Sequence, residues 1–310
     1  MSTDAEAQTP TGLVFGGGGF IGRATCRALS ERGWRPVVAD TVVDSAGELE
    51  AHPCDVTDAE AVRAVVDRVR PAAVFHLAAL LGNETNADPV LATAVNIVGM
   101  GYVLEAAARA GVPRFVYASS IAVYGDQPDW GDHVVTEADH GRPAFLYGWH
   151  KQLNEATADL YERERGLRCV GLRISTVYGA GRKTGMSAPI NRLIEGAANG
   201  VTECIFGPDT DSCLVHVDDV GAALAILGTA PDPRHPVYNV GGEYSTIGQL
   251  ASLIQELRPG VEVRLGEAGK RIPHVSLVDG SRITEEFGFV PRSFQAWATA
   301  ALERQSAEAR

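Results

Sequence analysis

Tyr147 and Lys151 are the residues whose types and spacing most directly suggest chemistry. They stand four apart within residues 147–165, a stretch with a helical pattern, so both side chains would project from one helix face. A neighbouring ammonium stabilises a tyrosinate, and a tyrosine of lowered pKa can exchange a proton with a substrate oxygen. The alternative is an exposed tyrosine–lysine contact, although the chain has only three lysines beside its 8 tyrosines. The pair predicts acid–base catalysis on a hydroxyl or carbonyl group.

Two adjacent serines end an upstream apolar run. Ser119 and Ser120 follow residues 114–118, which are expected to form a buried strand. Ligands of an open parallel sheet bind at the carboxyl ends of its strands, where a hydroxyl could hold the reacting oxygen. Serine also commonly caps turns and helices, so both roles stay open here.

A glycine-rich segment, GGGGFIG at residues 16–22, follows the first apolar run and opens the first helical pattern. Glycine lets the backbone turn tightly and approach a pyrophosphate, whose charge is then bound by free amides at the helix N-terminus. The segment fits GxxGxxG through Gly16, Gly19 and Gly22, and it also fits GxGxxG through Gly17. Its context between a strand and a helix predicts a dinucleotide site.

Asp40 ends the second predicted strand, 18 residues past Gly22. An acidic residue near this spacing accepts hydrogen bonds from the adenosine ribose hydroxyls and repels a 2′-phosphate. The alternative is that Asp40 only begins a loop, as aspartate often does. We predict that the site binds NAD in preference to NADP.

These residues must be positioned by alternating strands and helices, the pattern of a parallel sheet covered on both faces. Gly33, Gly111 and Gly166 each stand where a helix gives way to a strand, as left-handed C-terminal caps do. The sequence predicts an α/β, doubly wound Rossmann fold. Its expected strands are 13–15, 36–39, 73–77, 114–118 and 167–174, and its expected helices are 21–32, 59–70, 89–110 and 147–165.

The spacing loosens after Tyr178, which predicts a small, discontinuous C-terminal substrate lobe. A strand at residues 237–240 returns the chain to the main sheet, and short strands are expected at 201–208 and 261–265. The expected division has a disordered leader (1–11), a Rossmann domain (12–177 with about 210–242), a substrate lobe (about 178–209 with 243–302) and a solvated tail (303–310).

Composition excludes several classes of function. The 27 basic residues are scattered among 39 acidic ones, so the net charge of −12 argues against a nucleic-acid partner. The five cysteines lack metal-ligand spacing and are expected to be reduced and buried, with no metal site. We find neither a long uninterrupted apolar run nor a signal peptide, so we expect no membrane association and a cytoplasmic protein.

Taken together, the motifs resemble the extended short-chain dehydrogenases/reductases, the NAD-dependent epimerase/dehydratase family. The resemblance covers about residues 12 to 242 in the family's order. The matching segments are GGGGFIG, Asp55-Val56, HLAA (76–79), VNIVG (95–99), ASSIAVYG (118–125), YxxxK, LRISTVYGAGR (172–182), HVDDV (216–220) and YNVGG (238–242).

The resemblance implies a role for each matching residue. Tyr147 would be the acid/base, Lys151 would hold the nicotinamide ribose and tune Tyr147, and Ser120 would be the hydroxyl partner. It also implies a homodimer through helices 89–110 and 147–165. The implied NAD contacts are Gly16, Gly19, Phe20, Ile21 and Gly22 at the pyrophosphate, Asp40 at the adenosine ribose, Asp55 and Val56 near adenine, and Leu77, Ala78, Ala79 and Asn96 along the cofactor.

Two branches of the family share features with the chain. Residues 78–89 and the segment before HVDDV resemble threonine 3-dehydrogenases and erythronate dehydrogenases, whereas LRISTVYGAGR resembles nucleotide-sugar epimerases. The epimerases usually carry an arginine for the diphosphate before HVDD, where this chain has residues 211–214, DSCL, and their asparagine is Thr176 here. Asp211 in particular would be unfavourable for an anion.

We therefore expect NAD-dependent hydride transfer at a secondary alcohol or ketone of a small polar, sugar-like or hydroxy-acid substrate. A nucleotide-sugar 4-epimerase, dehydratase or decarboxylase that retains NAD is the alternative, and a non-catalytic NAD-binding module is a third possibility. Candidate substrate contacts are Leu81, Thr176, Arg182, Lys183, Lys270, Arg271 and His274.

Overall fold

The alternating pattern forms a seven-stranded parallel sheet, which confirms the predicted fold class. The structure is a computed structural model that describes residues 9–182, 184–185, 187–197, 200–269 and 273–308. The strand order is β10-β6-β5-β4-β1-β2-β3. From β1 the chain first adds β2 and β3 on one side and then crosses to add β4, β5, β6 and β10 on the other, and such a switch point between β1 and β4 opens a crevice for ligands. The strands are β1 (Thr11–Phe15), β2 (Arg35–Asp40), β3 (Ala51–Pro53), β4 (Ala73–His76), β5 (Arg114–Ser120), β6 (Cys169–Ile174) and β10 (Val237–Val240).

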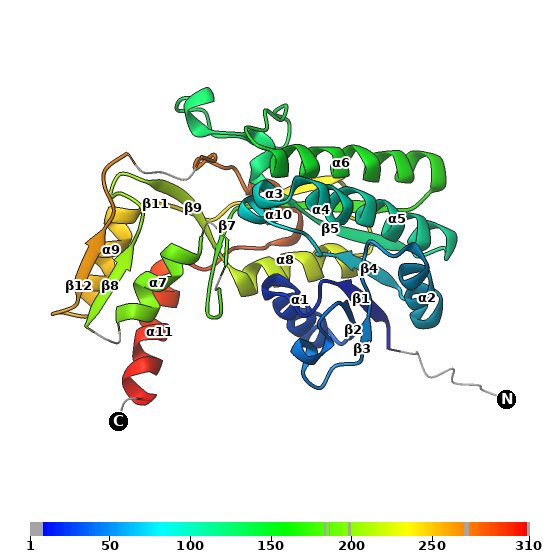
Figure 1. Cartoon of the computed structure of the whole chain (residues 1–310), viewed down its shortest axis with the longest axis horizontal. Helices are drawn as coiled ribbons and strands as arrows, with labels where there is room; N and C mark the ends of the chain where they lie inside the picture. Colours follow the sequence, from blue (N-terminus) through cyan, green and yellow to red (C-terminus); the bar gives the residue numbers. More distant parts are fainter. Residues whose placement is uncertain (1–8, 183, 186, 198–199, 270–272, 309–310) are drawn as a thin grey trace.

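Helices cover both faces of this sheet (Figure 1). Helices α1 and α8 share one apolar core with the strands, while α2, α5 and α6 share the other. Gly33, Gly111 and Gly166 all have positive φ, between 66° and 76°, which confirms the predicted left-handed caps. The helices are α1 (Phe20–Glu31), α2 (Ala59–Val69), α3 (Gly82–Ala87), α4 (Pro89–Thr93), α5 (Met100–Arg109), α6 (Leu146–Arg165) and α8 (Val217–Thr229).

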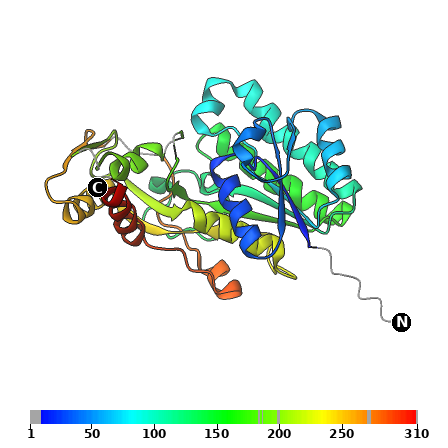
Figure 2. The ribbon, with the colours of Figure 1, turned by 90° about the horizontal axis from the view of Figure 1, so that it is seen from below.

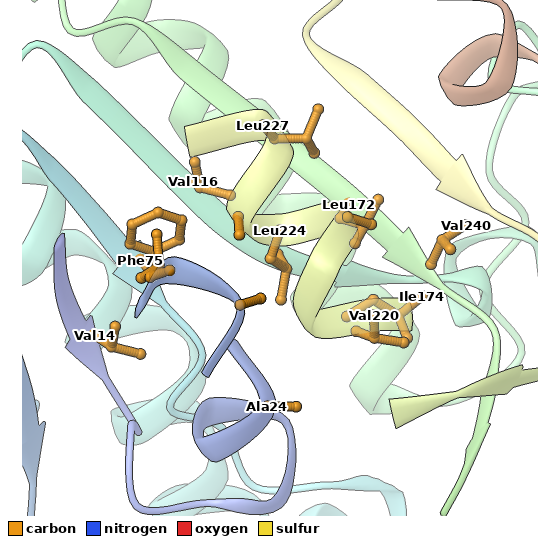
Figure 3. Packing of buried hydrophobic residues seen from close by; sticks show 14 of the residues in the cluster. Val14, Ala24, Phe75, Val116, Leu172, Ile174, Val220, Leu224, Leu227 and Val240 are labelled. Atoms are coloured by element: carbon orange, nitrogen blue, oxygen red, sulfur yellow. The ribbon is translucent and has the colours of Figure 1, made fainter. Parts of the chain in front are cut away.

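Helix α8 anchors the sheet from one side. Its Val220, Leu224 and Leu227 lie against Val116 and Leu172 of the strands (Figure 3). Its Gly221 faces α1, where an added methyl group would lie 2.5 Å from the backbone of Ala24. The two helices therefore pack backbone to backbone, which holds α1 and the glycine loop before it at a fixed place on the sheet.

The helical run Pro89–Arg109 contains α4, a π-helical segment, η2 (Ala94–Gly99), and α5. By length and composition alone the run could cross a membrane, but 44% of its most apolar window is buried within the fold. Core helices pass the same test, so the run is weak evidence for a membrane segment. All five cysteines are free and buried, as predicted.

A smaller lobe lies beside the sheet and holds the C-terminal helix α11 at the end of the molecule away from β1 (Figure 2). It contains two short sheets, ordered β11-β9-β7 and β12-β8, around an apolar core of its own. Three 3₁₀ turns complete the described chain: η1 (Val43–Ala46), η3 (Ile121–Tyr124) and η4 (Gln127–Asp129). The lobe elements are β7 (Thr176–Tyr178), α7 (Ala188–Ala197), β8 (Val201–Cys204), β9 (Asp211–His216), β11 (Glu243–Thr246), α9 (Ile247–Leu257), β12 (Glu262–Leu265) and α11 (Phe294–Glu308). Helix α10 (Ser281–Phe287) instead packs on β10, and its Ile283 belongs to the apolar core of the main sheet.

The structure differs from the expected boundaries in four places. Helix α10, within the segment 243–302 expected in the lobe, packs on β10 of the main sheet. Strand β1 begins at Thr11, inside the expected leader, and residues 1–8 lie outside the described chain. Strands β7 and β9, expected in the Rossmann domain, pair with each other in the sheet of the lobe, because the chain leaves the main sheet after Ile174. The expected tail from residue 303 continues α11 to Glu308, since Leu302 at its start is buried in the lobe core.

Candidate active site

Tyr147 and Ser120 meet where α6 begins and β5 ends. Their side chains form a hydrogen bond, which the sequence could only suggest. Burial raises the pKa of Tyr147 to about 12, while the nearby Arg182 guanidinium and the Ser120 hydrogen bond act to lower it. The phenol is therefore protonated at neutral pH in the ligand-free chain and can donate a proton to an oxygen in the cavity.

Lys151 lies one turn further along α6, with its Nζ atom 5.4 Å from the centre of the Tyr147 ring. The ammonium donates a hydrogen bond to the carbonyl oxygen of Ala118 at 2.7 Å, which directs it to the end of β5. Burial lowers the pKa of Lys151 to about 8, and the carboxylate of Glu155 opposes that change. The pair shares one helix face as expected, and Arg182 is a second cation near the phenol.

The three residues line a cavity of about 360 Å³ together with the glycine loop. Four of the seven expected substrate contacts line it too. The expected residues around this cavity are Gly16, Gly19, Phe20, Ile21, Gly22, Leu77, Ala79, Leu81, Ser120, Tyr147, Lys151, Thr176, Arg182 and His274.

The glycine loop has the shape that a pyrophosphate site needs. Gly16 has φ of 78°, and a methyl group on Gly22 would lie 2.1 Å from the carbonyl oxygen of Gly16. Gly19, the N-cap of α1, has no side chain to cap the helix, so the first amides remain available for an anion. The backbone amide of Gly18 donates to Oδ2 of Asp40 at 3.0 Å, which brings the carboxylate at the end of β2 next to the loop. The loop and Asp40 therefore fit a dinucleotide whose ribose hydroxyls Asp40 would bind.

Three other expected NAD contacts, Asp55, Val56 and Ala78, are not on the cavity wall. Ala78 packs against Gly16, where an added methyl group would lie 2.7 Å from its amide nitrogen. Val56 is buried against Gly99, and the Asp55 carboxylate accepts hydrogen bonds from the amide and hydroxyl of Thr57. The structure thus gives Val56 and Asp55 local packing and turn-forming contacts.

Asn96 lies away from the cavity wall, although the resemblance implies an NAD contact. Its side-chain amide bonds both backbone groups of Leu80, with the Leu80 amide at 2.8 Å and the Leu80 carbonyl at 2.9 Å. The side chain is buried, and it lies in the π-helical segment. Asn96 therefore fixes the turn that carries Leu81 into the cavity.

Two of the substrate candidates, Thr176 and His274, lie together. His274 Nε2 lies 3.2 Å from both the Thr176 and the Ser212 hydroxyls, forming a buried polar cluster. Asp211, expected to repel an anion, instead accepts a hydrogen bond from Ser276 at 2.5 Å and is not on the cavity wall. Lys183, Lys270 and Arg271 lie outside the described residues.

Arg182 is the described substrate candidate that brings a positive charge to the cavity wall. Its Cζ atom lies 5.3 Å from the centre of the Phe20 ring, and its Nε donates to Ser187 at 3.1 Å. Burial lowers the pKa of Arg182, but an arginine stays charged in proteins. The guanidinium therefore lies between the glycine loop and Tyr147.

Sequence reasoning missed Glu84 and Ser187 on the cavity wall and Glu155 beneath it. A signal existed for Glu155, which stands four residues after Lys151 and so shares its helix face. Glu84 lies in the short helix α3, where its carboxylate accepts from the Leu81 amide, and Ser187 lies in the loop before α7, whose course depends on the lobe.

Known proteins share the sequence pattern and the fold of this chain. A family model described as "NAD dependent epimerase/dehydratase family" matches residues 12–241. The chain belongs to this family. It is an enzyme of the short-chain dehydrogenase/reductase type, an oxidoreductase that uses NAD.

Three relatives show the breadth of the family. A UDP-glucose 4-epimerase from Rhizobium leguminosarum bv. trifolii is 35% identical over 91% of this chain and 93% of its own length. The mitochondrial L-threonine 3-dehydrogenase of Sus scrofa is 27% identical over 84% of this chain and 71% of its own. The crystal structure of the UDP-glucose 4-epimerase from Thermus thermophilus in complex with NAD has a TM-score of 0.82 and 26% identity, and covers 96% of this chain and 99% of that one. The relatives thus act on small molecules.

Proposed function

We propose that this family member transfers hydride reversibly between NAD and a secondary alcohol or ketone of a small polar substrate, sugar-like or a hydroxy acid. The observation that carries the proposal is the shared cavity, where Tyr147, Ser120 and Lys151 line the same wall as the glycine loop. A binding module without catalysis would have no need of this set of side chains.

The chain's own residues would manage the proton and the position of the reacting oxygen. When bound, NAD supplies the acceptor for the hydride. In the direction of reduction Tyr147 donates its phenol proton to the reacting oxygen, and in the direction of oxidation its tyrosinate form takes the hydroxyl proton. Ser120 fixes the reacting oxygen beside the phenol. Lys151 holds the nicotinamide ribose and keeps a positive charge near the tyrosinate as it forms.

Arg182 would bind an anionic group of the substrate, because it is a guanidinium on the cavity wall beside the phenol. It would also support the tyrosinate during the reaction. A small hydroxy acid fits this arrangement, because its carboxylate stands one carbon or a few carbons from the reacting hydroxyl. The carboxylate would bind Arg182 while the hydroxyl lies at Tyr147.

Replacing Arg182 with glutamine should raise KM for an anionic substrate by about 10- to 150-fold, because a hydrogen bond to a charged group contributes about 1.5–3 kcal/mol. The rate of oxidation should also need a higher pH, since the guanidinium lowers the pKa of Tyr147. Arg182→Lys keeps the charge but loses the bidentate geometry, so its KM should lie between that of the unsubstituted chain and that of Arg182→Gln. Steady-state kinetics across pH would measure both effects. An unchanged KM in Arg182→Gln would remove the anion-binding role.

A nucleotide-sugar 4-epimerase is the second candidate, and it is favoured by the 35% identity to a UDP-glucose 4-epimerase. Against it, residues 211–214 lack the arginine that such enzymes usually present to a diphosphate, and Ser212 there is buried against His274.

A panel of hydroxy acids, sugars and UDP-sugars, each supplied with NAD, would decide between the candidates. NADH formed from a hydroxy acid or sugar supports the dehydrogenase. Interconversion of UDP-sugars without net NADH supports the epimerase and would overturn the first proposal.

We also propose a homodimer through α4–α5 and α6, which lie side by side on one edge of the molecule (Figure 1). Seven large apolar side chains on these helices and on the π-helical segment between α4 and α5 are exposed, as dimer-forming helices require: Val90, Leu91, Val98, Tyr102, Trp149, Leu153 and Leu160. The Rossmann domain would carry the cofactor and the lobe the substrate. We keep the prediction of a cytoplasmic protein without a nucleic-acid or membrane partner.

A further inference from the structure

Glu155 joins three parts of the fold beneath the cavity. It lies one turn beyond Lys151 on α6, and its Oε1 accepts hydrogen bonds from the Ser119 hydroxyl at 2.5 Å and from Nε of Arg173 at 2.9 Å. Its Oε2 accepts from Nη2 of Arg173 at 2.8 Å. The Glu155 and Arg173 side chains are only 15% and 9% exposed. The carboxylate is therefore held in one place between α6, β5 and β6.

Arg173 extends this network to a further strand. Its Nη1 donates to the Tyr124 hydroxyl at 2.7 Å, and that hydroxyl donates to Oδ1 of Asn239 on β10 at 2.8 Å. A buried ion pair contributes little net stability, because removing two charges from water costs about as much as their attraction returns. Its position directly behind Ser120 and Lys151 points to a role in the reaction centre instead.

We propose that Glu155 is a positioning residue that acts on the reaction centre in two ways. Through Ser119 it fixes the end of β5, where the next residue is Ser120. Its negative charge holds Lys151 in the ammonium form. Only the catalytic consequence of this role rests on the proposed function, because the effect of the charge on Lys151 is a property of the folded chain.

Lys151 has few other charged neighbours. Burial alone would favour the neutral amine, and Glu155 is the carboxylate that opposes this. Two histidines lie near Lys151. Burial, and secondarily the charge of Lys151, lowers the pKa of His76 at the end of β4 to about 3 and also lowers the pKa of His150 on α6. Both are thus neutral at pH 7, and Tyr147 on α6 is protonated. Arg173 is the cation that faces Glu155 from β6.

The chain allows the charge on Lys151 to be measured without substrate or cofactor. Its only other lysines are Lys183 and Lys270, so a Lys183→Arg/Lys270→Arg background carrying lysine labelled with ¹³C at Cε gives a single NMR signal. We would follow that signal from about pH 5.5 to 10 in the ligand-free protein, with Glu155 intact and with Glu155→Gln, and circular dichroism would confirm folding. Glutamine keeps the shape of the side chain and one acceptor oxygen, removes the charge, and replaces the other acceptor oxygen with an NH2 donor.

We expect the midpoint near pH 8 with Glu155 intact and lower by about one unit or more in Glu155→Gln, the usual effect of removing an opposite charge nearby. Glu162→Gln is the matched control, because Glu162 lies further along the same helix, α6, and pairs with Arg168 beyond the end of that helix. It should leave the midpoint unchanged. If Glu155→Gln does not fold, Arg173→Gln tests the same proposal. Removing Arg173 leaves the Glu155 charge without its cation, so the midpoint of the Lys151 titration should rise instead of fall.

Equal midpoints in Glu155→Gln and the background protein would overturn the proposal, as would a shift of the same size in Glu162→Gln. The pH dependence of kcat/KM tests independently whether the charge on Lys151 matters for catalysis. If the NMR midpoint moves but the alkaline limb of kcat/KM does not, Glu155 controls the charge of Lys151 and the proposed catalytic role of Lys151 is wrong.

Discussion

Tyr147→Phe should lower kcat/KM by about 10²- to 10⁴-fold, the range attributed to positioned general acids and bases. The substitution removes the hydroxyl that is hydrogen-bonded to Ser120 and leaves the ring and its neighbours in place. NAD affinity should change little, because the glycine loop and Asp40 do not touch the phenol. Initial-rate kinetics and NAD titration of the same preparation would separate the two quantities.

Tyr161→Phe is the matched control for this substitution. Tyr161 lies on the same helix, α6, but its hydroxyl donates to Glu105 on α5, away from the cavity. We expect activity close to that of the unsubstituted chain. A Tyr147→Phe enzyme of full activity would contradict the assignment of the phenol as the acid/base.

Gly22→Ala should weaken NAD binding by about 100-fold, equivalent to about 3 kcal/mol. A methyl group there would lie 2.1 Å from the Gly16 oxygen and 2.6 Å from the Gly17 Cα atom, so the backbone of the loop must move. Because the pyrophosphate would bind to this backbone, the displacement acts directly on the cofactor site. Fluorescence or calorimetric titration with NAD measures the effect, and thermal unfolding measures any loss of stability.

Gly101→Ala provides the control for replacing a glycine inside a helix. Gly101 lies in α5, and a methyl group there would meet nothing within 4 Å. Alanine favours helices over glycine by about 1 kcal/mol, so this variant should be as stable as the parent or more so, with unchanged NAD affinity. NAD binding that survives Gly22→Ala would show that the pyrophosphate does not lie on this loop.

Much of the Rossmann half could be predicted from the sequence because its signals are local. Apolar runs of strand length alternate with helical patterns, and Gly111 and Gly166 mark the ends of helices where a left-handed residue is needed. The glycine loop and the spacing from Tyr147 to Lys151 likewise reflect contacts within one turn or one strand–helix unit.

The lobe and the cavity wall could not be predicted as well, because their contacts join distant segments. Strand β7 follows β6 after a single residue, yet it pairs with β9 in another sheet, and nothing local indicates that change. Asn96 belongs to a motif associated with the cofactor, but its amide is taken up by Leu80, 16 residues away. Similarly, Arg182 acts on Tyr147 only because the lobe brings it to the cavity.

The most direct test of the central claim is the amount of NAD and NADH released by denaturing the purified, dialysed protein, expressed per subunit. A dehydrogenase that exchanges its cofactor at each turnover should release little nucleotide and should bind added NAD. Near-stoichiometric nucleotide that survives dialysis would contradict that account and would support the epimerase, which returns the hydride to its substrate and keeps NAD bound.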